Sequence, residues 1–139
     1  MPTTQNFKKG EQAWMVTSSN EQHAPFAVVF FARKITLTSW GKKQGTAVDA
    51  NDKNLQYRIS PRWTTLCRTE ADVQAYAATH GEAWSAQDIA HRIKINEGWM
   101  QSTAERSRAA HGEKYVDEVK RELAELRAAT PSFRVIFKS

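Results

Sequence analysis

The spacing of apolar residues changes once along this chain, near residue 69, and that change constrains the fold more than any other feature. Up to Cys67, apolar residues either run together or alternate with polar ones, as they do in β-strands. From Thr69 onward they recur at every third or fourth position, as on one face of a helix. The chain has 139 residues, the length of one domain. We therefore expect one α+β domain over residues 1–139, with a β-rich part at 7–67 and a helical part at 69–130.

The strongest strand signal lies between Phe26 and Trp40. Phe26–Ala32 is a continuous apolar run, which predicts a strand buried on both faces. Ile35–Trp40 then alternates and is rich in β-branched residues. Shorter strands separated by turns are expected at 7–16, 46–48, 55–59 and 64–67. This pattern predicts an N-terminal antiparallel β-sheet or small barrel.

About three helices and a closing strand are expected after the sheet. Thr69–Asp72 resembles a capping sequence and opens a short helix that Gly81 follows. A second helix begins at Ser85, and a third runs from Ala109 until Pro131 closes it. Alternating apolar residues then predict a terminal strand within residues 132–138.

The third helix carries a narrow apolar stripe at alternating spacings of three and four: Val116, Val119, Leu123 and Leu126. Such a stripe can pack against the sheet of its own chain. It can also form the seam of a homodimer, because a strict stripe of this kind is narrower than packing within a globular domain usually needs.

The sequence contains none of the common catalytic motifs. We find no glycine-rich phosphate loop, nucleophile elbow or His-Glu-x-x-His motif, and no two histidines at metal-ligand spacing. Cys67 could pair with a distant histidine, but it ends an apolar strand, where a buried thiol is the commoner outcome. We therefore expect a protein that is not an enzyme and has no catalytic residues, metal or cofactor.

The N-terminus and the cysteine content indicate the compartment. The sequence starts without a charged segment followed by an apolar stretch, and its longest apolar run is far too short to span a bilayer. A single cysteine excludes an internal disulfide. We expect a cytoplasmic protein with no membrane contact.

Positive charge is concentrated in the front half of the chain. The net charge is +5; residues 1–68 hold ten Lys/Arg and four Asp/Glu, whereas residues 69–139 hold ten and eleven. Such asymmetry favours a surface that faces a polyanion, although solubilising lysines would produce the same count. The expected partner is nucleic acid or a host nucleoprotein complex.

The segment Trp40–Thr46 combines turn, charge and aromatic side chain. Its two glycines permit a tight turn, Lys42 and Lys43 stand at the tip, and Trp40 offers a flat face for stacking on a base. The competing interpretation is a solubilising tip with Trp40 in the core. Arg58 alternates with Tyr57 and Ile59, so it should face away from them. The other candidate binding residues are Lys8, Lys9, Arg33, Lys34 and Arg62.

The opening segment Phe7–Val16 resembles the first strand of SH3-like small barrels, including the KOW and Tudor groups, in its basic-Gly-acidic turn before an apolar alternation. The resemblance covers at most residues 7–67, and the long loop at 17–25 and the apolar run after it depart from the pattern. It implies binding to nucleic acid or peptide. In general character the chain also resembles accessory proteins of phages and plasmids.

Two functions follow as expectations. The first is a non-catalytic nucleic-acid-binding protein that uses a basic, aromatic-containing β surface. The second is a mobile-element inhibitor of the anti-CRISPR or anti-restriction type, which binds a host protein or nucleoprotein complex.

Overall fold

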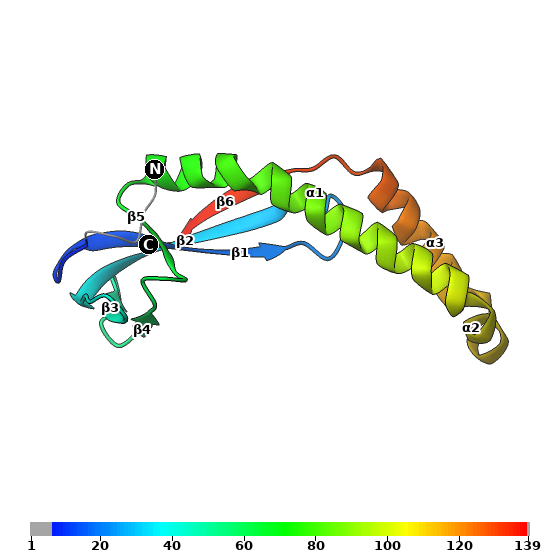
Figure 1. Cartoon of the computed structure of the whole chain (residues 1–139), viewed down its shortest axis with the longest axis horizontal. Coiled ribbons are helices and arrows are strands. Elements are labelled where there is room, and N and C mark those ends of the chain that lie inside the picture. Colours follow the sequence, from blue (N-terminus) through cyan, green and yellow to red (C-terminus); the bar gives the residue numbers. More distant parts are fainter. Residues whose placement is uncertain (1–6, 139) are drawn as a thin grey trace. The chain divides into compact units, whose positions relative to one another are not determined.

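The computed structural model of the chain describes residues 7–138 and confirms the expected α+β class (Figure 1). Antiparallel strands come first, then helices and a final strand. The strands are β1 (Gln12–Asn20), β2 (Val28–Ser39), β3 (Gly45–Asp49), β4 (Gln56–Ile59), β5 (Thr65–Cys67) and β6 (Phe133–Lys138). The helices are α1 (Glu70–Ser102), α2 (Ala104–His111) and α3 (Glu113–Ala128).

The sheet is open, with the strand order β4-β3-β2-β1-β5, and β6 also pairs with β2. The pairs β1–β5, β2–β3 and β3–β4 are antiparallel. The sequence left open a sheet or a small barrel. The structure has the open sheet, because β4 and β5 lie at its two edges and do not pair with each other.

The chain divides into two compact units. Among the described residues, unit 1 comprises 7–19, 29–80 and 133–138, and unit 2 comprises 20–28 and 81–132. Unit 1 therefore contains almost the whole sheet and the start of α1, whereas unit 2 contains the rest of α1 with α2 and α3.

The core of unit 1 draws on all five strands of the β4-to-β5 path. The cluster around Ile35 and Leu37 comprises Phe7, Ala13, Ile35, Leu37, Ala47, Ile59 and Leu66. A second set of contacts joins β2 to the start of α1 and to β6: the ring of Phe30 meets Tyr76 and Phe133 edge-on, at 5.9 and 6.2 Å between centroids. Strand β2 is therefore packed on both faces, as the apolar run predicted.

Strand β2 begins two residues later than that run. Phe26 has a φ of 59°, a left-handed conformation that an extended strand cannot include. Its ring is buried beside Ile89 and Leu126, in unit 2. The buried Ser85 hydroxyl donates to the Phe26 carbonyl oxygen at 3.0 Å and accepts from the Ser132 amide at 3.1 Å, so both neighbouring segments are held to α1.

Helix α3 packs within its own chain in unit 2. Val116, Leu123 and Leu126 of the apolar stripe are buried and Val119 is half-buried. Polar contacts to α1 flank the stripe: Asn96 Nδ2 donates to Glu122 at 3.3 Å, and Arg127 pairs with Glu97 at 2.9 Å. The cover of the stripe is thus a helix and Phe26 rather than the sheet that the sequence suggested.

Two expected helix boundaries are wrong. Helix α1 continues for 33 residues through Gly81 and Ser85, because Gly81 is buried and its packing outweighs the roughly 1 kcal/mol that a helical glycine costs. Conversely, the helix expected from Ala109 onward is interrupted at Gly112, whose φ of 84° ends α2 and starts α3. Ala109 belongs to α2.

Despite the length of α1, no helix within residues 7–138 has an apolar stretch sufficient to cross a membrane.

Candidate nucleic-acid interface

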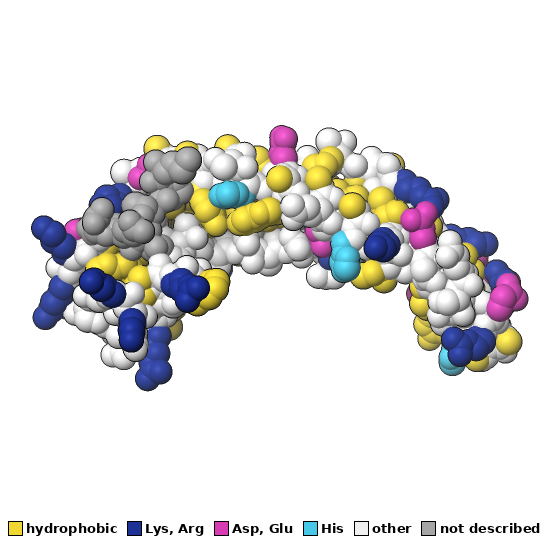
Figure 2. Space-filling view, viewed as in Figure 1, with side chains coloured by type: hydrophobic (Ala, Val, Ile, Leu, Met, Phe, Trp, Pro, Cys, Tyr) yellow, Lys and Arg dark blue, Asp and Glu magenta, His cyan; other side chains and the backbone are white. Residues whose placement is uncertain are grey.

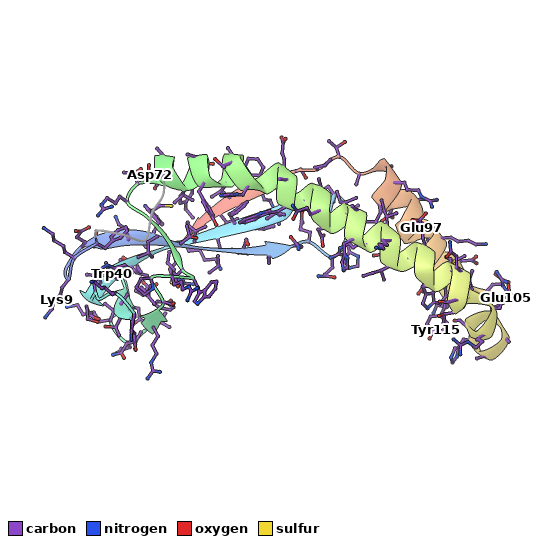
Figure 3. The ribbon with its side chains drawn as sticks, in the orientation of Figure 1. Lys9, Trp40, Asp72, Glu97, Glu105 and Tyr115 are labelled. Carbon is purple, nitrogen blue, oxygen red and sulfur yellow. The ribbon has the colours of Figure 1, made fainter. Side chains whose placement is uncertain are left out.

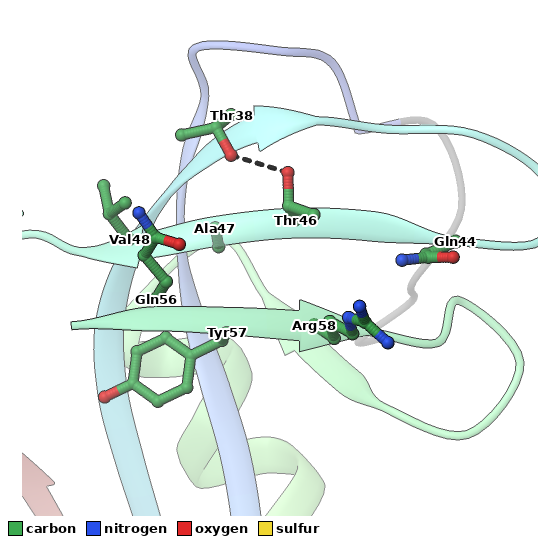
Figure 4. Close-up of a pocket in the computed structure, with 8 residues that line it drawn as sticks. All are labelled: Thr38, Gln44, Thr46, Ala47, Val48, Gln56, Tyr57 and Arg58. Carbon is green, nitrogen blue, oxygen red and sulfur yellow. Dashed lines mark hydrogen bonds between the residues drawn. The ribbon is translucent and has the colours of Figure 1, made fainter. Parts of the chain in front are cut away.

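Two loops of unit 1 leave the β3–β4 hairpin at the same end. In the antiparallel register of these strands, Gly45 faces Ile59 and Thr46 faces Arg58. The turn at 40–44 precedes Gly45 and the loop at 60–64 follows Ile59, so both extend from one end of the hairpin. Figure 4 shows the Gln44 and Arg58 side chains at this end of the two strands.

Basic side chains gather at this end from the turn at 40–44 and from the segment 58–62. Lys42 and Lys43 are exposed in the turn, and Arg58 and Arg62 are exposed on β4 and in the following loop. Figure 2 shows Lys and Arg side chains over the part of the molecule that carries β3 and β4.

Lys8 and Lys9 reach the same end through the turn before β1. The Gly10 amide donates to the Leu37 carbonyl oxygen at 2.8 Å, and the Phe7 ring meets the Trp40 ring 5.8 Å away. Gly10 has a φ of 90°, which a residue with a side chain rarely adopts. Figure 3 labels Lys9 and Trp40 on this part of the chain. We call the six exposed cations the basic end: Lys8, Lys9, Lys42, Lys43, Arg58 and Arg62.

The side chains of the basic end are not used in ion pairs within the described part of the chain. Among the ion pairs found within residues 7–138, none involves any of its six side chains. Its cations therefore remain available to an anionic partner.

A pocket of about 630 Å³ lies on the same hairpin (Figure 4). Its polar side chains are mainly neutral, and Arg58 provides its one charge. The lining residues are Thr38, Gln44, Thr46, Ala47, Val48, Gln56, Tyr57 and Arg58. The Thr38 and Thr46 hydroxyls are 2.7 Å apart and hydrogen-bonded. Hydroxyl and amide groups without a carboxylate suit a ligand that is anionic or rich in hydrogen-bonding groups.

Arg58 lies as its sequence parity predicted. It is exposed on the face of β4 opposite to Ile59, which is buried in the core, and Tyr57, which packs against that core.

Two predicted binding residues, Arg33 and Lys34, lie away from the basic end. Arg33 Nη1 pairs with Asp49 Oδ2 at 2.9 Å, and Asp49 ends β3 at the opposite end from Gly45. A hydrogen bond from the Asn51 amide, and then the Arg33 guanidinium, lower the pKa of Asp49 below its ordinary value. Lys34 Nζ lies 5.8 Å from the centroid of the Trp14 ring. The charge of Arg33 is thus compensated inside the chain.

Trp40 is half-buried and packs against the core cluster of unit 1. Its ring rests on Gly45, where an added Cβ would come within 2.7 Å of Trp40 Cε3. This geometry favours the core interpretation of Trp40 over the stacking one.

The exposed aromatic side chain of this end is Trp63, which is not among the candidate binding residues, although Arg62-Trp63 repeats the pairing of a basic with an aromatic residue. It is 78% exposed, and the Arg62 guanidinium carbon lies 5.0 Å from its ring centroid. The available signal was Pro61-Arg62-Trp63 between two short strands, where a turn exposes its side chains.

Comparisons with protein-family models, with curated proteins and with solved structures find no match to this chain.

Proposed function

We propose that this protein binds nucleic acid, without catalysis, through the basic end of unit 1. The observation that carries the proposal is the convergence of six exposed cations, none in an ion pair within residues 7–138, on one end of the β3–β4 hairpin.

Phosphate binding is the chemistry that such a surface favours. Each lysine or arginine that neutralises a phosphate releases a condensed counterion, and this release supplies sequence-independent affinity. The adjacent pocket adds the Gln44 and Gln56 amides, which can donate and accept hydrogen bonds at sugars or base edges. Because the six cations come from three separate segments, the folding of unit 1 brings them together on one surface.

The test reverses two charges at the tip. In Lys42→Glu, Lys43→Glu, both changes fall on exposed turn side chains, so thermal stability should stay within about 0.5 kcal/mol of wild type. Binding of fluorescent single- and double-stranded oligonucleotides, measured by anisotropy at low salt, should weaken at least tenfold. The matched control is Lys114→Glu, Lys120→Glu on α3, which changes net charge equally on exposed residues of unit 2 and should bind much more tightly than the tip variant.

Two results would overturn the proposal. One is equal weakening in both variants, because then only net charge matters. The other is no binding by the wild-type protein at low salt. The second result would leave the inhibitor of a host complex as the function to pursue, since the same cations could meet an acidic protein surface.

A further inference from the structure

We infer that Trp63 is a stacking platform that makes the basic end selective for single-stranded nucleic acid. This inference rests on the proposed function and specifies its ligand. Trp63, 78% exposed, is the most exposed of the large apolar side chains in the described part of the chain, ahead of Ile95 at 54%. The inference requires that the ring be held in place, accessible and flanked by cations.

The loop that carries Trp63 is held by its backbone. The Ser60 carbonyl oxygen accepts hydrogen bonds from the Trp63 amide at 3.0 Å and from the Thr64 amide at 2.9 Å. Pro61 occupies the second position of this turn, where its restricted φ suits the turn geometry. A loop whose backbone is ordered before binding loses little backbone entropy when a ligand arrives.

The indole is flanked by positive charge. Arg62 lies over the ring, and Arg58 precedes the loop on β4. Lys42 and Lys43 lie in the turn that leaves the hairpin at the same end, as the Gly45–Ile59 pairing requires. Charge that follows the phosphates beside an aromatic face that receives a base is the arrangement found at single-strand binding surfaces.

This arrangement distinguishes single strands from duplexes. In a duplex, neighbouring bases stack on one another, so an exposed indole gains a base only if the duplex is opened. In a single strand the base faces are accessible, and stacking on an aromatic side chain adds affinity with little sequence preference. Both single strands and duplexes can make the phosphate contacts, but only a single strand should stack a base on Trp63.

The experiment measures Trp63→Ala, Trp63→Phe and wild type against oligothymidylate, oligouridylate and a DNA duplex. Trp63→Ala should bind both single strands about 5- to 150-fold more weakly and the duplex within about twofold of wild type. Trp63→Phe should recover part of the lost affinity, because phenylalanine keeps a smaller π-face. Comparing oligouridylate with oligodeoxyuridylate, which carries the same base, identifies which sugar the site prefers.

The matched control is Tyr115→Ala, which removes another exposed aromatic, 49% exposed, from unit 2 and should change no affinity. Unchanged melting temperatures in both alanine variants make the comparison one of binding alone. If Trp63→Ala binds single strands as well as wild type while Lys42→Glu, Lys43→Glu loses binding, the stacking inference is wrong and the proposed function stands. Equal losses on single strand and duplex would also overturn the inference.

Discussion

Exposure separates two tryptophans that the sequence presents alike. Trp40 and Trp63 each lie within two residues of a basic side chain, in a turn between two strands. Trp40 covers the core of unit 1 and meets Phe7 edge-on, whereas Trp63 extends into solvent beneath Arg62. Trp40 can pack against the core because its neighbour on β3, Gly45, has no side chain.

Gly45→Ala should therefore destabilise the protein. The new Cβ would lie 2.7 Å from Trp40 Cε3 and 3.1 Å from the Ser39 carbonyl oxygen, so the indole or the strand must shift. Overpacking of this kind costs about 1–3 kcal/mol. Urea denaturation measures the loss as a lower transition midpoint.

Gly98→Ala is the matched control for that variant. Gly98 lies inside α1 with nothing within 4 Å of an added Cβ, so alanine should stabilise the helix by about 1 kcal/mol. Shifts of the same sign in the two variants would contradict the packing of Trp40 on Gly45.

Cys67 should be inert at neutral pH and should make stability pH-dependent under alkaline conditions. It is buried at the end of β5, and burial, followed by the charge of Asp72, raises its pKa from the ordinary 9.0 to about 11. The thiolate is the reactive form, so the native protein should react with a thiol reagent at pH 8 only as fast as it unfolds.

The sign of the stability change follows from that raised pKa. Above pH 9 the unfolded chain loses the thiol proton first, so stability present below pH 9 declines as the pH rises to about 11. Comparing urea midpoints of wild type and Cys67→Ala across this range isolates the contribution of the thiol from those of lysines and tyrosines. An identical pH dependence in the two proteins would contradict the assignment.

At the scale of elements, a glycine ends a helix in this chain only where the backbone adopts a positive φ. Gly112 has a positive φ and separates α2 from α3, whereas Gly81 lies buried inside α1 and interrupts nothing. The two glycines look alike as helix terminators in the sequence. They differ in burial and in backbone conformation, since Gly81 is buried and helical whereas Gly112 is exposed with a positive φ.

The stripe on α3 permits a prediction about oligomeric state. Leu123 is 8% exposed within a single chain, so Leu123→Asp should bury a charge in unit 2 and unfold it. Ala124→Asp adds the same charge at the adjacent exposed position and should leave the helix folded. Circular dichroism and light scattering distinguish the outcomes: a folded Leu123→Asp protein of half the wild-type mass would establish the homodimer seam instead.

At the scale of the whole molecule, most of the excess positive charge of residues 1–68 lies on one surface, the basic end. The ten cations of residues 1–68 are not used alike: Arg33 and Arg68 pair with Asp49 and Glu11, and the basic end holds six others. We therefore expect the salt dependence of nucleic-acid binding to arise from the six cations of the basic end, which are a minority of the 20 basic residues of the chain.

The salt dependence of single-strand binding should have a logarithmic slope of about −4 if all six cations of the basic end contact phosphates. Lys42→Gln, Lys43→Gln should reduce the magnitude of that slope by about 1.4, because each lost contact removes about 0.7. Anisotropy titrations at several salt concentrations measure both slopes. A slope that the double variant leaves unchanged would place the phosphate contacts elsewhere.

Much of the fold could be predicted because its signals are local. The apolar run Phe26–Ala32, the parity of Arg58 and the change of period near Thr69 depend on neighbours in sequence. The structure confirms all three, except that β2 begins at Val28 rather than Phe26. The candidate site was less predictable. Two of the nine candidate residues, Arg33 and Lys34, lie away from the basic end, and the exposed Trp63 is not among the nine. Ion pairing and exposure could not be predicted because they depend on residues far away in the sequence.

The sequence by itself determined that strands precede helices, that the change comes near residue 69 and which half carries the positive charge, because periodicity and composition are properties of short stretches of chain. It did not determine every boundary, since β1 runs through Asn20 into the expected loop at 17–25. Only the tertiary structure decided that residues 8–9, 42–43 and 58–62 lie at one end of a hairpin and that Trp63, rather than Trp40, faces solvent. The physical reason is that strand register and burial arise from contacts between residues far apart in sequence. The pairing of Gly45 with Ile59 and the seat of Trp40 on Gly45 are two such contacts.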